Sequence, residues 1–226
     1  LGDLKRERGI MNVRSTLDFP RGYWKKRFRS FVNLSNLDPT WKQINLAPPP
    51  SDPTIIKKET DELLKKKENG RADRIEEIEL EADQLTPKFS RILVMNDVSH
   101  PGTAEVIDAI IIAGRLAHFH FKEKFNRPRP SQLEPDIEPV IDNPGHPAYP
   151  SGHANQHYMI ALALSEFVPV YEDKFKEIAR RVAENREYAG VHYESDTAAG
   201  FQLAEQFFPY FKNAYKEEFD RAKAEW

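Results

Sequence analysis

Apolar residues recur at helical spacing over most of the chain beyond residue 50, and no segment alternates convincingly between apolar and polar positions as a strand does. Proline, glycine and capping residues indicate where the helices begin and end. Ser51 or Asp52 can cap a helix whose first turn contains Pro53. We predict helices over 53–68, 71–85, 87–95, from Thr103 to the "RPRP" segment at 127–130, from Ser151–His153 to before Pro169, over 172–189, from Tyr193–Asp196 to Phe208, and after Pro209.

The longest apolar run begins at Thr103 and is apolar around much of its circumference, which predicts a central, buried helix. Lys122 lies near its end, and the prolines of "RPRP" prevent the helix from continuing. Residues 131–150 are rich in Pro, Gly and Asn and show no period, so we predict a loop there. We also expect Pro209 to break the helix that contains Phe208. The fold class that follows is all-α, a compact helical bundle.

The first 47 residues differ from the rest of the chain. They lack a clean period and hold ten Lys and Arg against four Asp and Glu, about +6, whereas the remainder is near −9 because the whole chain is −3. The proline-rich "APPPSDP" at 47–53 favours an extended backbone and is predicted to be a linker. We therefore predict an N-terminal arm over 1–47 and a helical domain over 48–226. The arm carries no nucleic-acid-binding signature, so we expect it to be solvated or to pack on another subunit of a homo-oligomer, with no nucleic-acid partner.

Composition narrows the class of protein. Of 226 residues, 39% are hydrophobic and 31% are charged, the balance of a soluble globular protein. The run "VIDAIIIAG" is interrupted by Asp108 and is much shorter than the ~20 residues of a membrane span, so we expect no integral membrane segment. The absence of cysteine excludes disulfides, thiolate nucleophiles and Cys-based zinc sites. We expect a periplasmic or secreted location if a signal peptide has been removed, and a cytoplasmic one otherwise.

Three short blocks carry candidate chemistry. Ser151, Gly152 and His153 lie at a predicted helix N-terminus, where free amides and the helix dipole attract anions. Gly152 permits close approach of the backbone to a ligand, although an ordinary Ser cap followed by an incidental His would have the same sequence. His192 and Asp196 are four residues apart, so on a helix the carboxylate can fix the imidazole tautomer, or the two can form a plain surface pair.

Three cations complete the candidate site. Lys122 and Arg129 lie on either side of a helix end, and Arg186 precedes His192 by six positions. An arginine can offer two parallel donors to an oxyanion, and a lysine a point charge. Taken singly, cations at helix C-termini also stabilise the helix dipole without any ligand.

Together these residues form a recognisable pattern. Lys122 and Arg129-Pro130 are separated by six residues, "PSGH" ends at His153, and Arg186, His192 and Asp196 follow with gaps of five and three residues. This pattern resembles the three-part signature of the type 2 phosphatidic acid phosphatase and vanadium haloperoxidase superfamily. The short interval between His153 and Arg186 is most similar to that of the class A bacterial non-specific acid phosphatases. The resemblance covers roughly residues 48–226. In departure from that group's pattern, Asn185 stands where Ser is usual, and Ala154 stands where Thr is common and haloperoxidases often have Ala. Arg127-Pro128 duplicates the Arg-Pro pair without a lysine seven residues upstream.

The resemblance implies a helical bundle of the acid phosphatase/haloperoxidase type and a metal-independent phosphomonoesterase with a phosphohistidine intermediate. In that scheme His192 is the nucleophile, Asp196 orients it and His153 is the acid and base. The phosphate is bound by Lys122, Arg129, Ser151, Gly152 and Arg186.

Two other functions remain open. In a vanadium-dependent haloperoxidase the same pocket holds vanadate as a cofactor, whereas in the phosphatase no cofactor is required and vanadate is only a phosphate mimic. A phosphate-binding protein without activity would need only the cations, which the presence of both histidines and Asp196 disfavours. We expect the partner to be a small phosphate ester.

Overall fold

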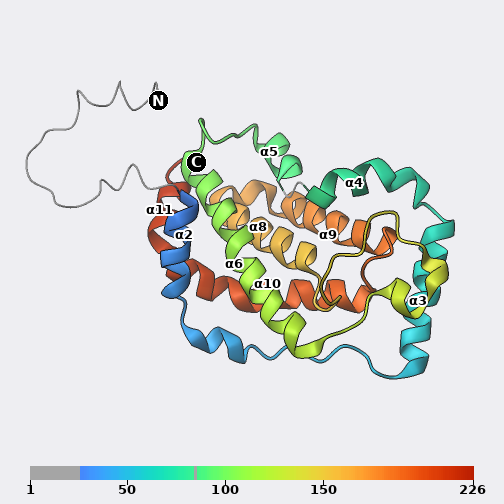
Figure 1. Cartoon of the computed structure of the whole chain (residues 1–226). Helices are drawn as coiled ribbons and strands as arrows, with labels where there is room; N and C mark the ends of the chain where they lie inside the picture. Colours follow the sequence, from blue (N-terminus) through green and yellow to red (C-terminus); the bar gives the residue numbers. More distant parts are fainter. Residues whose placement is uncertain (1–25, 84–85) are drawn as a thin grey trace, which may run out of the picture.

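The computed structural model describes residues 26–83 and 86–226, and within these ranges all regular structure is helical (Figure 1). The all-α fold class is confirmed. In chain order the elements are α2 (Lys26–Ser35), η3 (Pro39–Gln43), α3 (Pro53–Glu68), η4 (Ala72–Arg74), α4 (Ile75–Asp83), α5 (Pro87–Leu93), α6 (Pro101–Phe125), α7 (Pro130–Leu133), η5 (Pro135–Ile137), α8 (Gly152–Phe167), η6 (Pro169–Tyr171), α9 (Glu172–Tyr188), α10 (Glu194–Ala214) and α11 (Lys216–Lys223).

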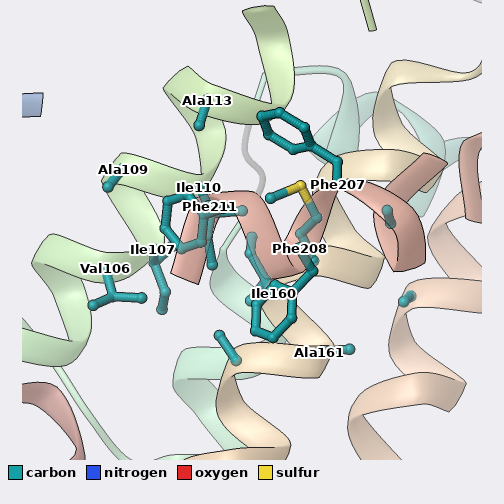
Figure 2. Packing of buried hydrophobic residues seen from close by; sticks show 14 of the residues in the cluster. Val106, Ile107, Ala109, Ile110, Ala113, Ile160, Ala161, Phe207, Phe208 and Phe211 are labelled. Atoms are coloured by element: carbon teal, nitrogen blue, oxygen red, sulfur yellow. The ribbon is translucent and has the colours of Figure 1, made fainter. Parts of the chain in front are cut away.

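The core is built by α6, α8 and α10, which pack on one another, while α9 packs along α8. Helix α3 lies at one end of the bundle and α2 and α11 lie at the other (Figure 1). Apolar side chains from the three central helices meet in one cluster, as Figure 2 shows for Ile110, Ile160 and Phe211. The prediction that the run after Thr103 forms a central helix is therefore confirmed, since Val106, Ile110 and Ala113 are fully buried.

Helix α6 begins at Pro101, two residues before the predicted start, because its first turn is capped from the far end of the chain. The carboxylate of Glu225 accepts hydrogen bonds from the amides of Gly102 (2.6 Å) and Thr103 (2.8 Å) and from the Thr103 hydroxyl (2.7 Å). The preceding residue, His100, makes no side-chain cap. An anionic group on the first amides also interacts favourably with the helix dipole.

Pro209 does not break its helix, so that prediction is wrong. Helix α10 continues through it to Ala214, and the next helix begins only at Lys216. A proline inside a helix removes one backbone hydrogen bond and costs about 3 kcal/mol. Here Phe207, Phe208 and Phe211 lie on both sides of the proline and are buried in the core (Figure 2). Burying a side chain of this size stabilises by about 1.5–3 kcal/mol each, which outweighs the cost.

Helices α8 and α10 approach each other closely at Gly200. A Cβ at this position would lie 2.7 Å from both the Ala154 Cβ and the Ser151 carbonyl oxygen. The absence of a side chain therefore lets the second turn of α10 lie directly on the first turn of α8. This contact brings the residues that precede both helices into the same region.

Residues before position 48 contribute to the same core as those after it. Leu37, Trp41 and Leu46 are buried in the main cluster, and the Tyr149 hydroxyl donates to the Ala47 carbonyl (2.5 Å). The predicted division into an arm and a domain at residue 47 is untested as a domain boundary, and residues 1–25 of the arm lie outside the described residues. Residues 84–85, which end the predicted helix 71–85, lie outside them too.

The predicted loop over 131–150 is irregular for most of its length but includes α7 and η5 near its start. Asp52 rather than Ser51 caps α3, through a 2.8 Å bond from the Thr54 amide. No helix in the described ranges has the length and apolarity needed to cross a membrane.

Candidate active site

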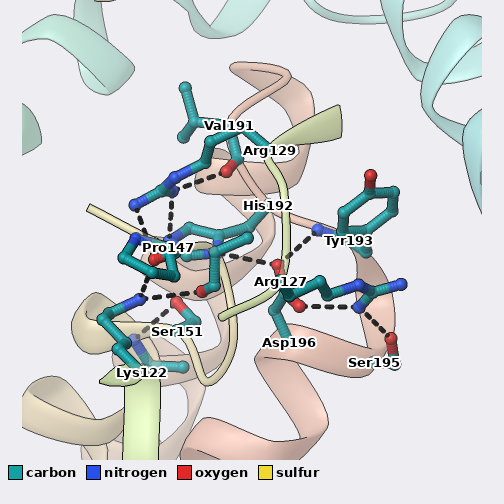
Figure 3. Close-up of polar contacts among 12 residues, drawn as sticks. Lys122, Arg127, Arg129, Pro147, Ser151, Val191, His192, Tyr193, Ser195 and Asp196 are labelled. Carbon is teal, nitrogen blue, oxygen red and sulfur yellow. Dashed lines mark hydrogen bonds and ion pairs between the residues drawn. The ribbon is translucent and has the colours of Figure 1, made fainter. Parts of the chain in front are cut away.

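His192 and Asp196 form a buried pair at the start of α10. The Nδ1 atom of His192 lies 3.0 Å from Oδ2 of Asp196, and the side chains are 4% and 0% exposed. The Nε2 atom faces Arg129, whose Nη1 is 3.1 Å away (Figure 3). Because a carboxylate accepts and a guanidinium donates, a neutral His192 carries its proton on Nδ1 and has its lone pair on Nε2. This is the tautomer that a nucleophilic imidazole needs.

Arg129 and Lys122 converge on the loop that leads into α8. Lys122 donates to the carbonyls of Pro147 (2.7 Å) and Ala148 (2.8 Å). Arg129 donates to the carbonyl of Val191 (2.7 Å), and to those of His146 (3.1 Å) and Pro147 (3.2 Å). The two cations therefore share the Pro147 carbonyl, and both are almost fully buried.

Ser151 and Gly152 begin α8 beside this group. The Ser151 hydroxyl accepts from the Ala154 amide (3.3 Å), so Ser151 is the N-cap of α8, and the Ser151 amide donates to the Asp196 carbonyl (2.9 Å). A Cβ on Gly152 would lie 2.9 Å from Cε1 of His118. Gly152 is therefore required where the imidazole of α6 lies against the first turn of α8.

The side chains of Arg186 and His153 both form hydrogen bonds with residues of α4. Nη2 of Arg186 donates to the Ile78 carbonyl (2.7 Å) and to the Glu81 carboxylate (3.1 Å). Its Nε and Nη1 are buried and have no hydrogen-bond partner among the described residues. Nε2 of His153 lies 3.1 Å from the Glu81 carbonyl oxygen, so this nitrogen carries a proton. Two unpartnered guanidinium donors are a suitable arrangement for an oxyanion.

Arg127 holds the other side of Asp196. Its Nη1 donates to Oδ1 of Asp196 (2.7 Å) and to the Ser195 hydroxyl (2.7 Å), and its Nη2 donates to Glu59 of α3 (2.7 Å). The guanidinium lies 3.7 Å from the ring centroid of Tyr193. The two arginines of "RPRP" thus lie on either side of the His192–Asp196 pair (Figure 3).

Burial and positive charge set the ionisation of the histidines. Burial lowers the pKa of His192 well below its usual value, and Arg129 and Lys122 lower it further. The pKa of His153 is lowered in the same way by burial and then by Arg186. Both imidazoles are therefore neutral in this arrangement at neutral pH.

Opposite effects act on Asp196 and Lys122. Burial raises the pKa of Asp196, while Arg127 and the Tyr193 amide lower it. Burial and the charge of Arg129 lower the pKa of Lys122, and Asp196 raises it. A bound anion would favour the charged form of the lysine.

A hollow of about 420 Å³ adjoins the site. Arg129 and His146 form part of its wall, together with Gln132 and Asn143. Burial and the charge of Lys122 lower the pKa of His146 to about 4, so this wall presents a neutral imidazole beside the Arg129 cation. These polar side chains can bind a polar ligand.

All eight predicted site residues lie in one region, as two neighbouring groups. The first group lies in or around the segment 146–152 and consists of Lys122, Arg129, Ser151, Gly152, His192 and Asp196. The second group consists of His153 and Arg186, which both contact α4. His153 directly follows Gly152 in α8, and the Val191 amide next to His192 donates to the Arg186 carbonyl (3.2 Å), which places the groups next to each other.

Sequence reasoning missed several polar neighbours of the site. His118 could have been found, because it precedes Lys122 by one helical turn. Arg127 was visible as a duplicate Arg-Pro pair but had no assigned role. Glu59 and Glu81 gave no signal, since they lie on helices far away in the sequence.

Comparisons with known proteins agree with this arrangement. A family model described as the PAP2 superfamily matches residues 105–218. The non-specific acid phosphatases of Salmonella typhi and Salmonella typhimurium are 27% and 28% identical to the chain over 137 residues. These matches cover 55% of the chain and 53% of each relative, so the chain spans about half the length of the curated relatives it matches.

The fold is shared with solved structures. The first bacterial vanadium-dependent iodoperoxidase superimposes with a TM-score of 0.61 at 16% sequence identity, covering 77% of this chain and 54% of that one. At this identity the likeness concerns the fold alone.

Proposed function

The chain belongs to the PAP2 superfamily, and on that premise we propose that it hydrolyses small phosphate monoesters through a phosphohistidine at His192, without a metal ion. The observation that carries the proposal is the pair in which Asp196 binds Nδ1 of His192 while Nε2 faces the Arg129 guanidinium (Figure 3). A fixed tautomer with its lone pair on Nε2, next to an oxyanion-binding cation that can turn to the phosphate, is the requirement for attack on phosphorus.

In the first half-reaction Nε2 of His192 forms a bond to phosphorus as the ester P–O bond breaks. The positive charge that develops on the imidazole is stabilised by Asp196, which keeps the Nδ1 proton. The negative charge of the bound phosphate favours the imidazolium form of His153, which gives its Nε2 proton to the leaving oxygen and becomes a neutral imidazole with its proton on Nδ1. The leaving oxygen replaces the Glu81 carbonyl as the partner of that proton.

In the second half-reaction water attacks the phosphorus and the P–N bond breaks. His153, now without its Nε2 proton, accepts a proton from the water, and inorganic phosphate leaves. The equatorial oxygens are bound by Lys122, Arg129 and Arg186 with the Ser151 hydroxyl and the Gly152 amide, since a loose phosphoryl transition state carries its charge there. The unpartnered Nε and Nη1 of Arg186 support this assignment.

Trapping of the intermediate tests the proposal. Wild-type protein is mixed with a phosphate monoester, quenched in base, where phosphohistidine survives, and digested for mass spectrometry. We expect phosphate on the peptide that contains His192, none in His192→Ala, and unchanged turnover after dialysis against EDTA. Phosphate on another residue, or turnover by His192→Ala, would overturn the assignment of the nucleophile.

The haloperoxidase alternative uses the same residues. Vanadate is a tetrahedral oxyanion like phosphate, so Arg186, Arg129 and Lys122 would hold it, and the unpartnered Arg186 donors fit such a group. Bound vanadate would supply the activation of peroxide that halide oxidation needs. Bromide oxidation by peroxide after vanadate loading, without phosphate ester hydrolysis, would favour this alternative.

A further inference from the structure

We propose that Arg127, braced by Glu59, is a positioning residue that fixes which oxygen of Asp196 faces His192 and so aims the imidazole at phosphorus. This inference rests on the proposed role of His192 as nucleophile. It assigns a function to the first arginine of "RPRP", which the phosphate-binding scheme leaves unused.

The first observation is the division of the Asp196 oxygens. Oδ1 accepts from Arg127 (2.7 Å), whereas Oδ2 accepts from Nδ1 of His192 (3.0 Å) and from the Tyr193 amide (3.1 Å). The carboxylate is fully buried, so water cannot replace a lost partner. Without Arg127, Oδ1 would lose its only charged donor in the described structure, and rotation of the carboxylate would no longer be opposed.

The second observation is that Arg127 is itself held in place. Glu59 of α3 binds Nη2 of Arg127 through one oxygen (2.7 Å) and the Ser195 amide through the other (3.0 Å). The Tyr193 ring lies against the guanidinium plane at 3.7 Å. Helix α3, the "RPRP" segment and the first turn of α10 are thereby joined at one point, and a planar fork is needed to reach Asp196 and Glu59 together.

The third observation separates Arg127 from the phosphate-binding cations. The guanidinium donors of Arg129 go to His192 and to the segment 146–147 and Val191, and none goes to Asp196. Those of Arg127 go to Asp196, Ser195 and Glu59, and none goes to His192. Six titratable or charged groups in the described residues interact electrostatically with Asp196: His192, Lys122, Arg127, Arg129, Tyr149 and Tyr193. Of these, Arg127 alone contacts Oδ1 in the described residues.

The test compares Arg127→Gln, Arg127→Lys and Glu59→Gln with wild type, using p-nitrophenyl phosphate as substrate and inorganic phosphate as inhibitor. Loss of aim in a catalytic group costs about 10²-fold in rate, so we expect kcat of Arg127→Gln to fall by about that factor. We expect KM and the phosphate inhibition constant to stay within about threefold, because Lys122, Arg129 and Arg186 are untouched. Arg127→Lys, which keeps the charge but not the fork, should have an intermediate kcat.

The matched control is Arg221→Gln. Arg221 of α11 also joins two helices through a glutamate, Glu105 (3.1 Å), at the opposite end of α6 from Lys122, although its side chain is 44% exposed and that of Arg127 only 5%. We expect it to leave kcat unchanged. A kcat loss in Arg127→Gln alone, at a temperature at which both variants are fully folded, would separate positioning from general stability.

Either of two steady-state results would overturn the inference. One is a folded Arg127→Gln with kcat within threefold of wild type, and the other is a phosphate inhibition constant that weakens in parallel with kcat. If Arg127→Gln fails to fold, Arg127→Lys decides on the same two criteria.

If the wild-type protein forms no phosphohistidine at all, the proposed function fails. If it does and Arg127→Gln forms it at the wild-type rate, only the role of Arg127 fails.

Discussion

The contact between Gly152 and His118 gives a prediction whose size can be worked out. In Gly152→Ala the new methyl group would lie 2.9 Å from Cε1, 3.1 Å from Nε2 and 3.2 Å from Nδ1 of the His118 ring. Carbon atoms in contact lie about 3.5–4.0 Å apart, so the ring must move by roughly 0.6–1.1 Å. His118 is buried within the central helix, so it has little room to move.

The expected loss of stability follows from the cost of overpacking. An extra methyl group in a packed interior destabilises by about 1–3 kcal/mol. For a domain of this size each kcal/mol lowers Tm by about 2–4 °C, which predicts a decrease of about 2–12 °C. Urea unfolding and a thermal melt of wild type and Gly152→Ala would measure it.

A double-mutant cycle with His118→Ala assigns the cost to the imidazole. If the ring is the obstacle, adding Gly152→Ala to His118→Ala should cost about 0.5 kcal/mol or less. The matched control is Gly145→Ala, where a Cβ would meet nothing within 4 Å, and its stability should equal that of wild type. A Gly152→Ala protein as stable as wild type, or a cost that persists undiminished without the ring, would refute the reasoning.

Three more predictions follow from the described contacts. Gly200→Ala should destabilise more than Gly152→Ala, because one of its 2.7 Å contacts is to the Ser151 backbone, which cannot rotate away; a smaller decrease in Tm than that of Gly152→Ala contradicts this. His153→Ala should lose about 10²–10⁴-fold in kcat on alkyl phosphates and less on p-nitrophenyl phosphate, whose leaving group needs little protonation; equal losses count against His153 as the acid. Because burial and then Arg129 and Lys122 lower the pKa of His192, its imidazole should stay neutral as the pH falls to 6.5 and become protonated only below that value. An NMR titration of the free protein, assigned with His192→Gln, checks this, and a transition at or above pH 6.5 contradicts it.

Local signals in the sequence predicted the parts of the site that depend on local geometry. Ser151 caps α8. His192 and Asp196 do not share a helix face as their spacing suggested, because α10 begins only at Glu194; the 3.0 Å contact forms because the Asp196 carboxylate, in the first turn, points back to His192 and the Tyr193 amide. Pro209 shows where local rules fail, because aromatic residues on both sides of it are buried by helices distant in the sequence.

The neighbours of the site were harder to predict for the same reason. Glu59 contacts Arg127 across 68 positions and Glu81 contacts Arg186 across 105. No period or motif links such pairs, and only the packed helices bring them together. Arg127 was overlooked because the spacing from Lys122 selects Arg129, although both arginines contact the His192–Asp196 pair.

The cap on α6 has a consequence for how the polypeptide matures in the cell. The Gly102 amide in the first turn of α6 donates to a carboxylate that is 123 positions further along the chain. At a synthesis rate of about 5–20 residues per second, Glu225 is added roughly 6–25 s after Gly102. During that interval the first turn of α6 lacks its Glu225 cap, so the bundle can complete this contact only after Glu225 has emerged from the ribosome.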